Sequence, residues 1–215
     1  MQNKKHFIIG IDEVGRGSLA GPVFVGVAAV SKDGLLAIKN AERKFGKIKD
    51  SKKLSPKKRN EWFFFFKKNK DIFFNIKMMN PSLIDKLNIS KSANILALRA
   101  FKKIVLNKKI GKMDYDVFLD GGLYLGNKKN IFEMNGINKK AKTIIKGDEK
   151  IIAIRIASIV AKVLRDSYMI KISKKYKKYN FDVNKGYGTR FHINAIKKYG
   201  ASDIHRKTFI KNFVK

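Results

Sequence analysis

Three short apolar runs in this chain each end in acidic residues, and this placement constrains the fold more than any other feature. The runs are FIIGIDE (7–13), YDVFLDGG (115–122) and TIIKGD (143–148). Strands formed by these runs would bring their acids, Asp12, Glu13, Asp120 and Asp148, to one edge of a sheet. Carboxylates that meet at one edge repel each other unless a cation lies between them. Because Mg²⁺ and Mn²⁺ suit oxygen ligands, the sequence predicts a divalent metal site there.

The rest of the chain is strongly basic. Lys and Arg number 49 against 17 Asp and Glu, which gives a formal net charge of +32. Such a surface attracts nucleic acid in a salt-dependent way. The abundance of Lys, Asn, Ile and Phe also fits drift in an AT-rich genome, so the lysine excess has two explanations. A non-catalytic basic nucleic-acid-binding protein would explain the charge, but it would leave the placement of the acids unexplained.

Length and composition limit the class of protein. A chain of 215 residues fits one domain, taken here as residues 1–215. Cysteine is absent, which excludes disulfides and thiolate-bound zinc and fits a reducing cytosol. The first apolar stretch is too short for a signal peptide, and no uncharged run approaches the roughly 18 residues of a membrane helix. We expect a soluble, cytoplasmic protein with no membrane partner.

The hydrophobic periodicity predicts an α/β fold with a mixed sheet and terminal helices. Strands are expected at 7–13, 22–31, 71–80, 116–120 and 141–148. Helices are expected at 55–69, from Pro81, at 90–107, at 151–176 and at 190–200. Residues 32–50 predict a loop with at most a short helix, and a second loop is expected between 120 and 141. The aromatic run from Trp62 to Phe66 is expected to pack its helix on the sheet rather than to stack on bases.

Two polar segments each allow two interpretations. Gly15, Arg16 and Gly17 could form a simple turn, or they could let backbone N–H groups approach a sugar or phosphate closely. Ser51 and Lys52 could belong to a polar loop before a helix, or they could grip a phosphate near the helix entrance.

Aromatic and imidazole side chains give weaker signals. Tyr187 lies in the turn KGYGT, where its ring could be partly packed or could stack on a sugar or base. His6 is expected at the surface. His192 and His205 lack the spacing of a zinc pair, so we predict no histidine ligand.

Taken together, these segments resemble the ribonuclease HII family. The matching blocks run in order from residue 10 to 209: GIDEVGRGSLAGPV, DSKKLS, FLDGG, KGD followed by IASIVAKVLRD, and KGYGTRFHINAIKKYGASDIHRKTF. The resemblance implies a ribonuclease H-like fold, with a central five-stranded mixed β-sheet flanked by helices and a C-terminal helical portion at about 151–215. It also implies cleavage of RNA in RNA–DNA hybrids and incision 5′ of ribonucleotides embedded in duplex DNA.

The resemblance also implies roles for individual residues. The metal-binding acids of the family correspond to Asp12, Glu13 and Asp120, and its fourth catalytic acid to Asp148. These would hold two divalent ions, Mn²⁺ or Mg²⁺, and cleavage would leave a 5′-phosphate and a 3′-hydroxyl. The segment that reads the ribose 2′-OH corresponds to Gly15, Arg16 and Gly17, and the tyrosine that stacks at an RNA-to-DNA junction corresponds to Tyr187. Phosphate contacts are expected from basic side chains, namely Lys52, Lys146 and Arg165.

Four positions depart from the family pattern. Gly122 stands where Asn is usual, which would remove a hydrogen bond behind the metal ligands. Ser18 replaces a frequent Pro. Arg155 and Ile156 replace small residues, and we expect them to crowd the local helix packing. No departure removes an acid, so we expect an active enzyme with altered rate or metal preference.

The related ribonuclease HIII family would share the fold and the metal chemistry. It typically carries an extra N-terminal substrate-binding domain and a Glu as its fourth acid. The first strand here is expected by residue 7, and the fourth acid is Asp148, so the type HII interpretation is favoured. The expected partners are RNA–DNA hybrids and ribonucleotide-containing duplex DNA, with a replication clamp as a further candidate, and the chain is expected to act as a monomer.

Overall fold

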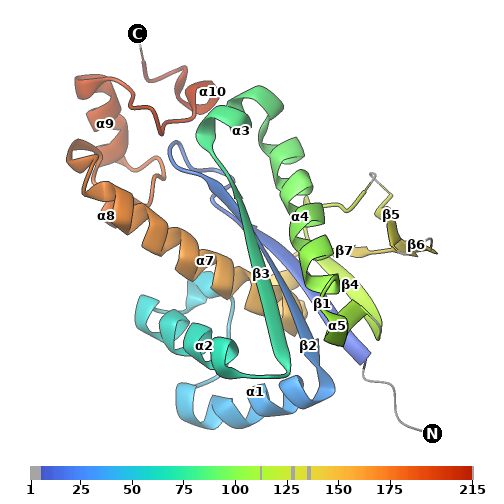
Figure 1. Cartoon of the computed structure of the whole chain (residues 1–215). Coiled ribbons are helices and arrows are strands. Elements are labelled where there is room, and N and C mark those ends of the chain that lie inside the picture. The colour runs from blue at the N-terminus through green and yellow to red at the C-terminus, as the bar shows by residue number, and fades with distance from the viewer. Residues whose placement is uncertain (1–5, 112, 127–128, 135–136, 215) are drawn as a thin grey trace, which may run out of the picture.

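Five strands form a central mixed sheet with helices on both faces (Figure 1). The computed structural model describes residues 6–111, 113–126, 129–134 and 137–214. The strand order is β3-β2-β1-β4-β7. The strands span Ile72–Met79 (β3), Val23–Ser31 (β2), His6–Val14 (β1), Asp114–Asp120 (β4) and Lys142–Ile144 (β7). The predicted five-stranded mixed sheet is therefore confirmed.

The pairing of β1 sets the position of the first acids. β1 runs antiparallel to β2 and parallel to β4, with Ile11 opposite Leu119. The carboxyl ends of parallel neighbours meet at the same edge of a sheet. The residues that follow this pair, Asp12 and Asp120, therefore lie on adjacent strands at that edge.

Two long helices cover the faces of the sheet. α4 (Ile89–Val105) packs on one face, where its apolar side chains join Ile9 and Ile11 in the larger core cluster. α7 (Ile152–Ser173) packs on the other face, very close to β1. A Cβ added to Gly10 would lie 2.1 Å from the backbone nitrogen of Ile154, so only glycine permits this approach. Because Asp12 is two residues from Gly10, its side chain points to the same α7 face.

Residues 32–50 do not form the predicted loop, because α1 occupies Lys32–Phe45. Ser31 caps this helix by accepting a hydrogen bond from the Gly34 backbone N–H (3.2 Å), and Gly46 follows it with a φ of 78°. Gly34 lies within α1 and does not interrupt it. A Cβ there would lie 2.7 Å from the Asp71 carbonyl oxygen, so this glycine serves close packing inside a helix.

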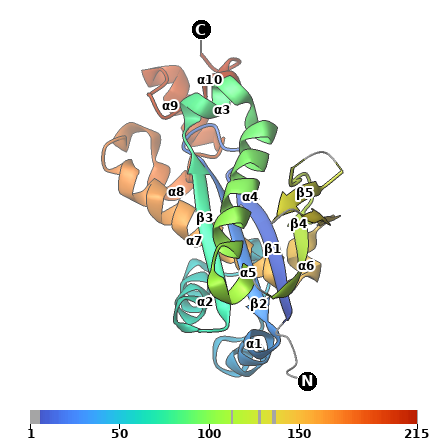
Figure 2. The same ribbon diagram turned by 45° about the vertical axis from the view of Figure 1, so that its right-hand side comes forward.

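Two further expectations for residues 120–148 were wrong. The last strand ends at Ile144 rather than at 148, since Lys146 takes a left-handed conformation (φ 54°) and α6 begins at once as Gly147–Lys150. The segment predicted as a loop contains a two-stranded hairpin, β5 (Ile131–Met134) and β6 (Ile137–Lys140). Figure 2 shows this hairpin projecting from the side of the molecule.

The other helices support the sheet and close one end of it. α2 (Pro56–Lys68) buries Trp62 and Phe66, which stack with ring centroids 5.7 Å apart, so the predicted packing of the aromatic run is confirmed for these two. α3 spans Pro81–Leu87 and α5 spans Lys108–Gly111. α8 (Phe181–Asn184), α9 (Arg190–Tyr199) and α10 (Lys207–Ile210) gather at one end of the molecule (Figures 1 and 2). Within the described ranges, no helix is both long and apolar enough to cross a membrane.

Candidate active site

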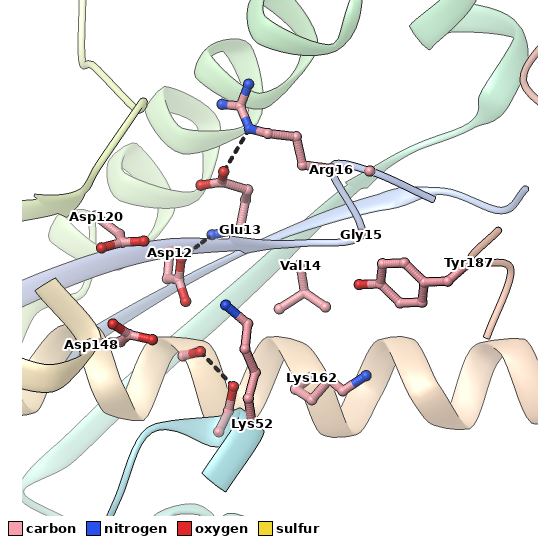
Figure 3. A pocket seen from close by; sticks show the side chains of 13 residues that line it. Asp12, Glu13, Val14, Gly15, Arg16, Lys52, Asp120, Asp148, Lys162 and Tyr187 are labelled. Carbon is pink, nitrogen blue, oxygen red and sulfur yellow. Dashed lines mark hydrogen bonds and ion pairs between the residues drawn. The ribbon is translucent and has the colours of Figure 1, made fainter. Parts of the chain in front are cut away.

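The carboxyl ends of β1 and β4 and the start of α6 open into one cleft of about 470 Å³ (Figure 3). All four acids singled out from the sequence line it. So do Gly15, Arg16, Gly17, Ser51, Lys52 and Tyr187. Ten of the twelve predicted site residues, separated by up to 175 positions in the chain, thus share one cavity.

Asp12 and Asp120 are each held by a backbone donor. The Asp12 carboxylate is buried and accepts a hydrogen bond from the Glu13 backbone N–H at 2.7 Å. The Asp120 carboxylate accepts one from the Gly147 backbone N–H, also at 2.7 Å. The second bond ties the end of β4 to the first turn of α6, which carries Asp148. Asp148 therefore reaches the cleft from a helix rather than from a strand end.

Glu13 lies on the other side of β1 from Asp12. The strand continues to Val14 without a break, so successive side chains alternate, and Figure 3 shows the two acids pointing in opposite directions. Glu13 Oε1 accepts a hydrogen bond from Arg16 Nε at 2.7 Å. Among the described residues, its buried Oε2 has no hydrogen-bond partner. Arg16 also donates to the carbonyl of Gly122 (3.3 Å) and to Ser90 Oγ (3.2 Å).

The crowding of carboxylates raises their pKa values. Burial, followed by the charge of Glu13, raises the pKa of Asp12 well above its ordinary value, and a hydrogen bond with Ser158 opposes this shift. Burial also raises the pKa of Glu13, against the effect of Arg16. For Asp148 the pKa is raised by burial and by the charges of Asp50 and Asp120. Keeping these groups ionised is therefore costly, and a bound cation would offset that cost.

A hard divalent cation fits this donor set. The acids supply only oxygen ligands, and the buried Glu13 Oε2 is an acceptor without a donor. However, no group of three or more His, Asp or Glu side chains in the described part of the chain is already arranged to hold a metal. Asp12 and Glu13 point in opposite directions, so both can approach one ion only after side-chain rotation.

Comparison with known proteins agrees with this site. The family model for ribonuclease HII matches residues 9–212. Ribonuclease HII of Caldicellulosiruptor bescii is 42% identical over 208 residues, covering 97% of this chain and 88% of the relative. That of Caldicellulosiruptor saccharolyticus is 39% identical over 209 residues, covering 97% and 89%. This chain belongs to the ribonuclease HII family.

Solved structures show the same fold. Ribonuclease H2 from Pyrococcus horikoshii superposes with a TM-score of 0.70 at 24% identity, with 96% of each chain covered. The PCNA:RNase HII complex from Archaeoglobus fulgidus gives 0.67 at 22%, again with 96% of each chain covered. Bst-RNase HIII in complex with Mn²⁺ gives 0.70 at 17%, covering 97% of this chain and 66% of the other. The fold is therefore shared with these structures, while the family model and the relatives about 40% identical show a metal-dependent endoribonuclease acting on RNA–DNA hybrids.

Arg165 does not have the environment that a phosphate contact needs. Its side chain is fully buried, and it donates to the carbonyls of Pro22 and Lys185 (3.0 Å each) and to Ser18 Oγ (2.8 Å). The protein itself engages most of the N–H donors of Arg165, so the predicted direct contact with phosphate has little donor capacity left in this arrangement. Ser18, noted as a departure from the ribonuclease HII pattern, supplies one of these acceptors.

The other predicted phosphate contacts differ in position. Lys52 lines the cleft, and its charge lowers the pKa of Asp148. Ser51 is buried and shares a hydrogen bond of 2.9 Å with Ser158 Oγ, so its hydroxyl is already engaged. Lys146 is exposed at the turn before α6 and is not among the residues that line the cleft.

Two polar residues that line the cleft beside the acids, Ser158 and Lys162, were not among the predicted site residues. They lie four residues apart on α7, so one face of this helix presents both. Both belong to the block IASIVAKV that matched the ribonuclease HII pattern, and their helical spacing was the signal available.

Arg155 was expected to crowd the helix packing, but its guanidinium instead binds backbone carbonyls. It donates to the carbonyls of Asp148 (2.7 Å), Glu149 (2.5 Å) and Ile48 (3.1 Å). These bonds connect α7 to the short helix α6 that carries the fourth acid. The departure from the family pattern at this position therefore adds support for Asp148.

Proposed function

We propose that this ribonuclease HII hydrolyses the RNA strand of RNA–DNA hybrids and incises duplex DNA 5′ of embedded ribonucleotides. The proposed ligands of two divalent ions are Asp12, Glu13, Asp120 and Asp148. The observation that carries the proposal is the convergence of these acids with the Gly15–Gly17 segment and Tyr187 in one cleft. A hybrid-binding protein without catalysis would not need carboxylates whose burial and mutual repulsion raise their pKa values.

The acids of this site bind the divalent ions and do not transfer protons. Two divalent ions, when bound, activate a water molecule and stabilise the charge of the leaving oxygen. Asp12 would be shared by the ions, since Glu13 and Asp120 both lie close enough for their charges to raise its pKa. Asp148, carried on α6 and supported by Arg155, approaches from the opposite side of the cleft from Glu13 (Figure 3). Mn²⁺ and Mg²⁺ are both candidates.

The backbone around Arg16 is suited to recognise a ribose. Arg206 donates to the carbonyls of Gly15 (2.7 Å) and Arg16 (2.8 Å), and these two bonds fix the conformation of the turn. Gly17 is exposed, and a Cβ there would meet no atom within 4 Å, so the outer side of the turn is open. The 2′-OH distinguishes RNA from DNA, and a rigid turn beside the acids could select a ribonucleotide by hydrogen bonding to it.

Tyr187 is proposed to stack on the sugar at an RNA-to-DNA junction. Its ring lines the cleft, with the Arg165 guanidinium 5.3 Å and the Lys162 ammonium 5.7 Å from the ring centroid. These cations contact the ring and favour its present orientation.

A sliding clamp is proposed as a partner, because a related ribonuclease HII has been solved in complex with PCNA. We also propose that the chain acts as a monomer in the cytoplasm.

An incision assay tests the function. A duplex with one embedded ribonucleotide is incubated with purified protein, with and without Mg²⁺ or Mn²⁺. We expect a single cut 5′ of the ribonucleotide only when metal is present. Cleavage of hybrids without incision of this duplex would favour a type HIII activity, and binding without any metal-dependent cut would favour the non-catalytic alternative.

A further inference from the structure

The backbone of Tyr187 is held by a buried histidine outside the cleft. The Tyr187 carbonyl accepts hydrogen bonds from the Thr189 backbone N–H (2.8 Å) and from His192 Nδ1 (2.9 Å). Gly186, with a φ of 81°, precedes the tyrosine, and its carbonyl accepts hydrogen bonds from the backbone N–H groups of Leu19 (2.8 Å) and Ala20 (3.2 Å). These bonds fix the turn before the tyrosine, and the bond from His192 restrains the tyrosine itself.

His192 is paired with a second buried histidine. Its Nε2 lies 3.0 Å from Nε2 of His205, and both side chains are almost fully buried. The rings of Tyr179 and Phe181 surround the pair, with centroids 4.8 to 6.3 Å from the imidazoles. Burial lowers the pKa of both histidines, for His205 to about 4, so both imidazoles are neutral at pH 7.

The hydrogen bonds around His192 and His205 determine which nitrogen of each neutral imidazole carries the proton. The Ser202 backbone N–H can only donate, and it points at His205 Nδ1 (2.9 Å), so that nitrogen accepts. A neutral His205 then carries its proton on Nε2 and donates to His192 Nε2. His192 therefore carries its proton on Nδ1, and this proton is donated to the Tyr187 carbonyl, which can only accept.

We propose that the His192–His205 pair positions Tyr187 at the cleft through a one-way chain of hydrogen bonds from Ser202. The chain links the segment before α10 to the turn before α9 without touching the acids or a substrate. The two histidines are thus positioning residues, and their effect falls on the reaction step that uses the tyrosine. This inference rests on the proposed role of Tyr187 at RNA-to-DNA junctions.

The variant His192→Phe tests the proposal, because phenylalanine suits the aromatic surroundings but cannot donate to Tyr187. Displacement of the Tyr187 ring should slow the step that uses it. We therefore expect the rate of junction incision to fall about tenfold further than the rate of cleavage of an all-RNA hybrid. His192→Asn places an amide donor near the position of Nδ1, and it should restore much of the selectivity. Equal losses on both substrates, or no rescue by Asn, would overturn the proposal.

Two further variants distinguish the role of the histidine pair from the proposed role of Tyr187. Tyr179→Phe removes the hydrogen bond from the Tyr179 hydroxyl to the Gly200 carbonyl in the same cluster, and it should affect both substrates alike. Tyr187→Ala should lose junction incision selectively; if it does not, the proposed role of the tyrosine fails and the inference falls with it, whereas a selective loss in Tyr187→Ala without one in His192→Phe refutes the inference alone.

The proton assignment has a readout that does not depend on activity. Nitrogen-15 NMR of the imidazoles should show the Nδ1–H form for His192 and the Nε2–H form for His205 at pH 7. The exposed His6 provides an internal reference from the same chain. Observation of the Nε2–H form at His192 would break the chain of hydrogen bonds and refute the proposal.

Discussion

Adjacent acids at the end of β1 have different surroundings, and the difference determines what each can do. Asp12 faces α7, where its carboxylate is buried and interacts with Ser158. Glu13 faces the opposite side, where one oxygen pairs with Arg16 and the other has no partner among the described residues. A strand that continues past both acids forces this division. The central question for the site is therefore how Glu13 and Asp12 come to share a cation.

Asp12→Asn should reduce cleavage by at least about 100-fold, because the site loses a charged ligand oxygen between the proposed ions. Binding of hybrid should remain nearly intact, since removing one negative charge cannot weaken a cationic groove. Cleavage rate and hybrid affinity should be measured on the same preparation. Asp114→Asn removes an equal charge from an exposed position at the start of β4 and serves as the control. Activity of Asp12→Asn within tenfold of the parent would contradict the metal assignment.

The raised pKa values of Asp12 and Glu13 predict how stability depends on pH without metal. A folded pKa above the unfolded one means that the folded state binds more protons, so stability falls as pH rises from the ordinary carboxyl range through the folded pKa. Asp12→Asn removes this penalty, so its metal-free Tm at pH 7 should exceed that of the parent, by about 2–4 °C for each kcal/mol regained. Thermal denaturation with and without Mg²⁺ measures both effects. Mg²⁺ should raise the Tm of the parent and raise that of the variant much less. An equal Tm for the parent and the variant without metal would show that the ionised Asp12 carboxylate does not destabilise the folded state.

Short elements position the fourth acid, and they depend on longer ones. α6 has four residues and follows a left-handed Lys146, so it cannot be stable alone. In the described part of the chain, its attachments include the Gly147 N–H bond to Asp120, the bonds from Arg155 on α7 and the ion pair of Glu149 with Lys53 (2.6 Å). The position of Asp148 is thus determined by a strand end on one side and by a helix on the other.

Arg155→Ala should release α6 from α7 and loosen Asp148. Each lost hydrogen bond from the charged guanidinium contributes roughly 1.5–3 kcal/mol, so both stability and divalent-ion affinity should fall. Calorimetric titration with Mn²⁺ and thermal denaturation provide the two readouts. Lys150→Ala changes an exposed cation on the same short helix and is the matched control. If Mn²⁺ affinity stays at the parent level while stability drops, Arg155 supports the fold but not the site.

The basic charge of the whole chain has two explanations, binding and genome composition, and position in the structure separates them. Lys52 and Lys162 line the cleft beside the acids. Many other lysines, such as the exposed Lys39 on α1, are not among the residues that line it. Only cations that meet phosphate should contribute to the salt dependence of binding.

Lys52→Gln should therefore lower the slope of log affinity against log salt concentration for duplex by about 0.9, the value expected for one phosphate contact. Lys39→Gln should leave the slope unchanged. Equilibrium binding over a series of salt concentrations, using the Asp12→Asn background to prevent cleavage, gives both values. A similar decrease for both variants would mean that the charge acts diffusely rather than through contacts in the cleft.

Local patterns in the chain were sufficient for most of the elements and for the identity of the acids. Apolar runs located the strands, and the acids at the ends of three of those runs share one cleft. Helix boundaries followed from Ser55, Pro81 and Gly200, because caps and turns depend on neighbouring residues. The errors at residues 32–50 and 121–140 arose where glycines or a polar composition suggested a loop.

Contacts between distant segments decided the rest. α1 needs a glycine at position 34 because the Asp71 carbonyl packs against it. Arg165 can be buried because acceptors from residues 18, 22 and 185 surround its guanidinium. The pairing of His192 with His205 likewise exists only after α8, α9 and the C-terminal segment have packed together. Periodicity records which face of an element is apolar, whereas the partner of a polar side chain depends on which distant backbone groups the fold brings within hydrogen-bonding distance.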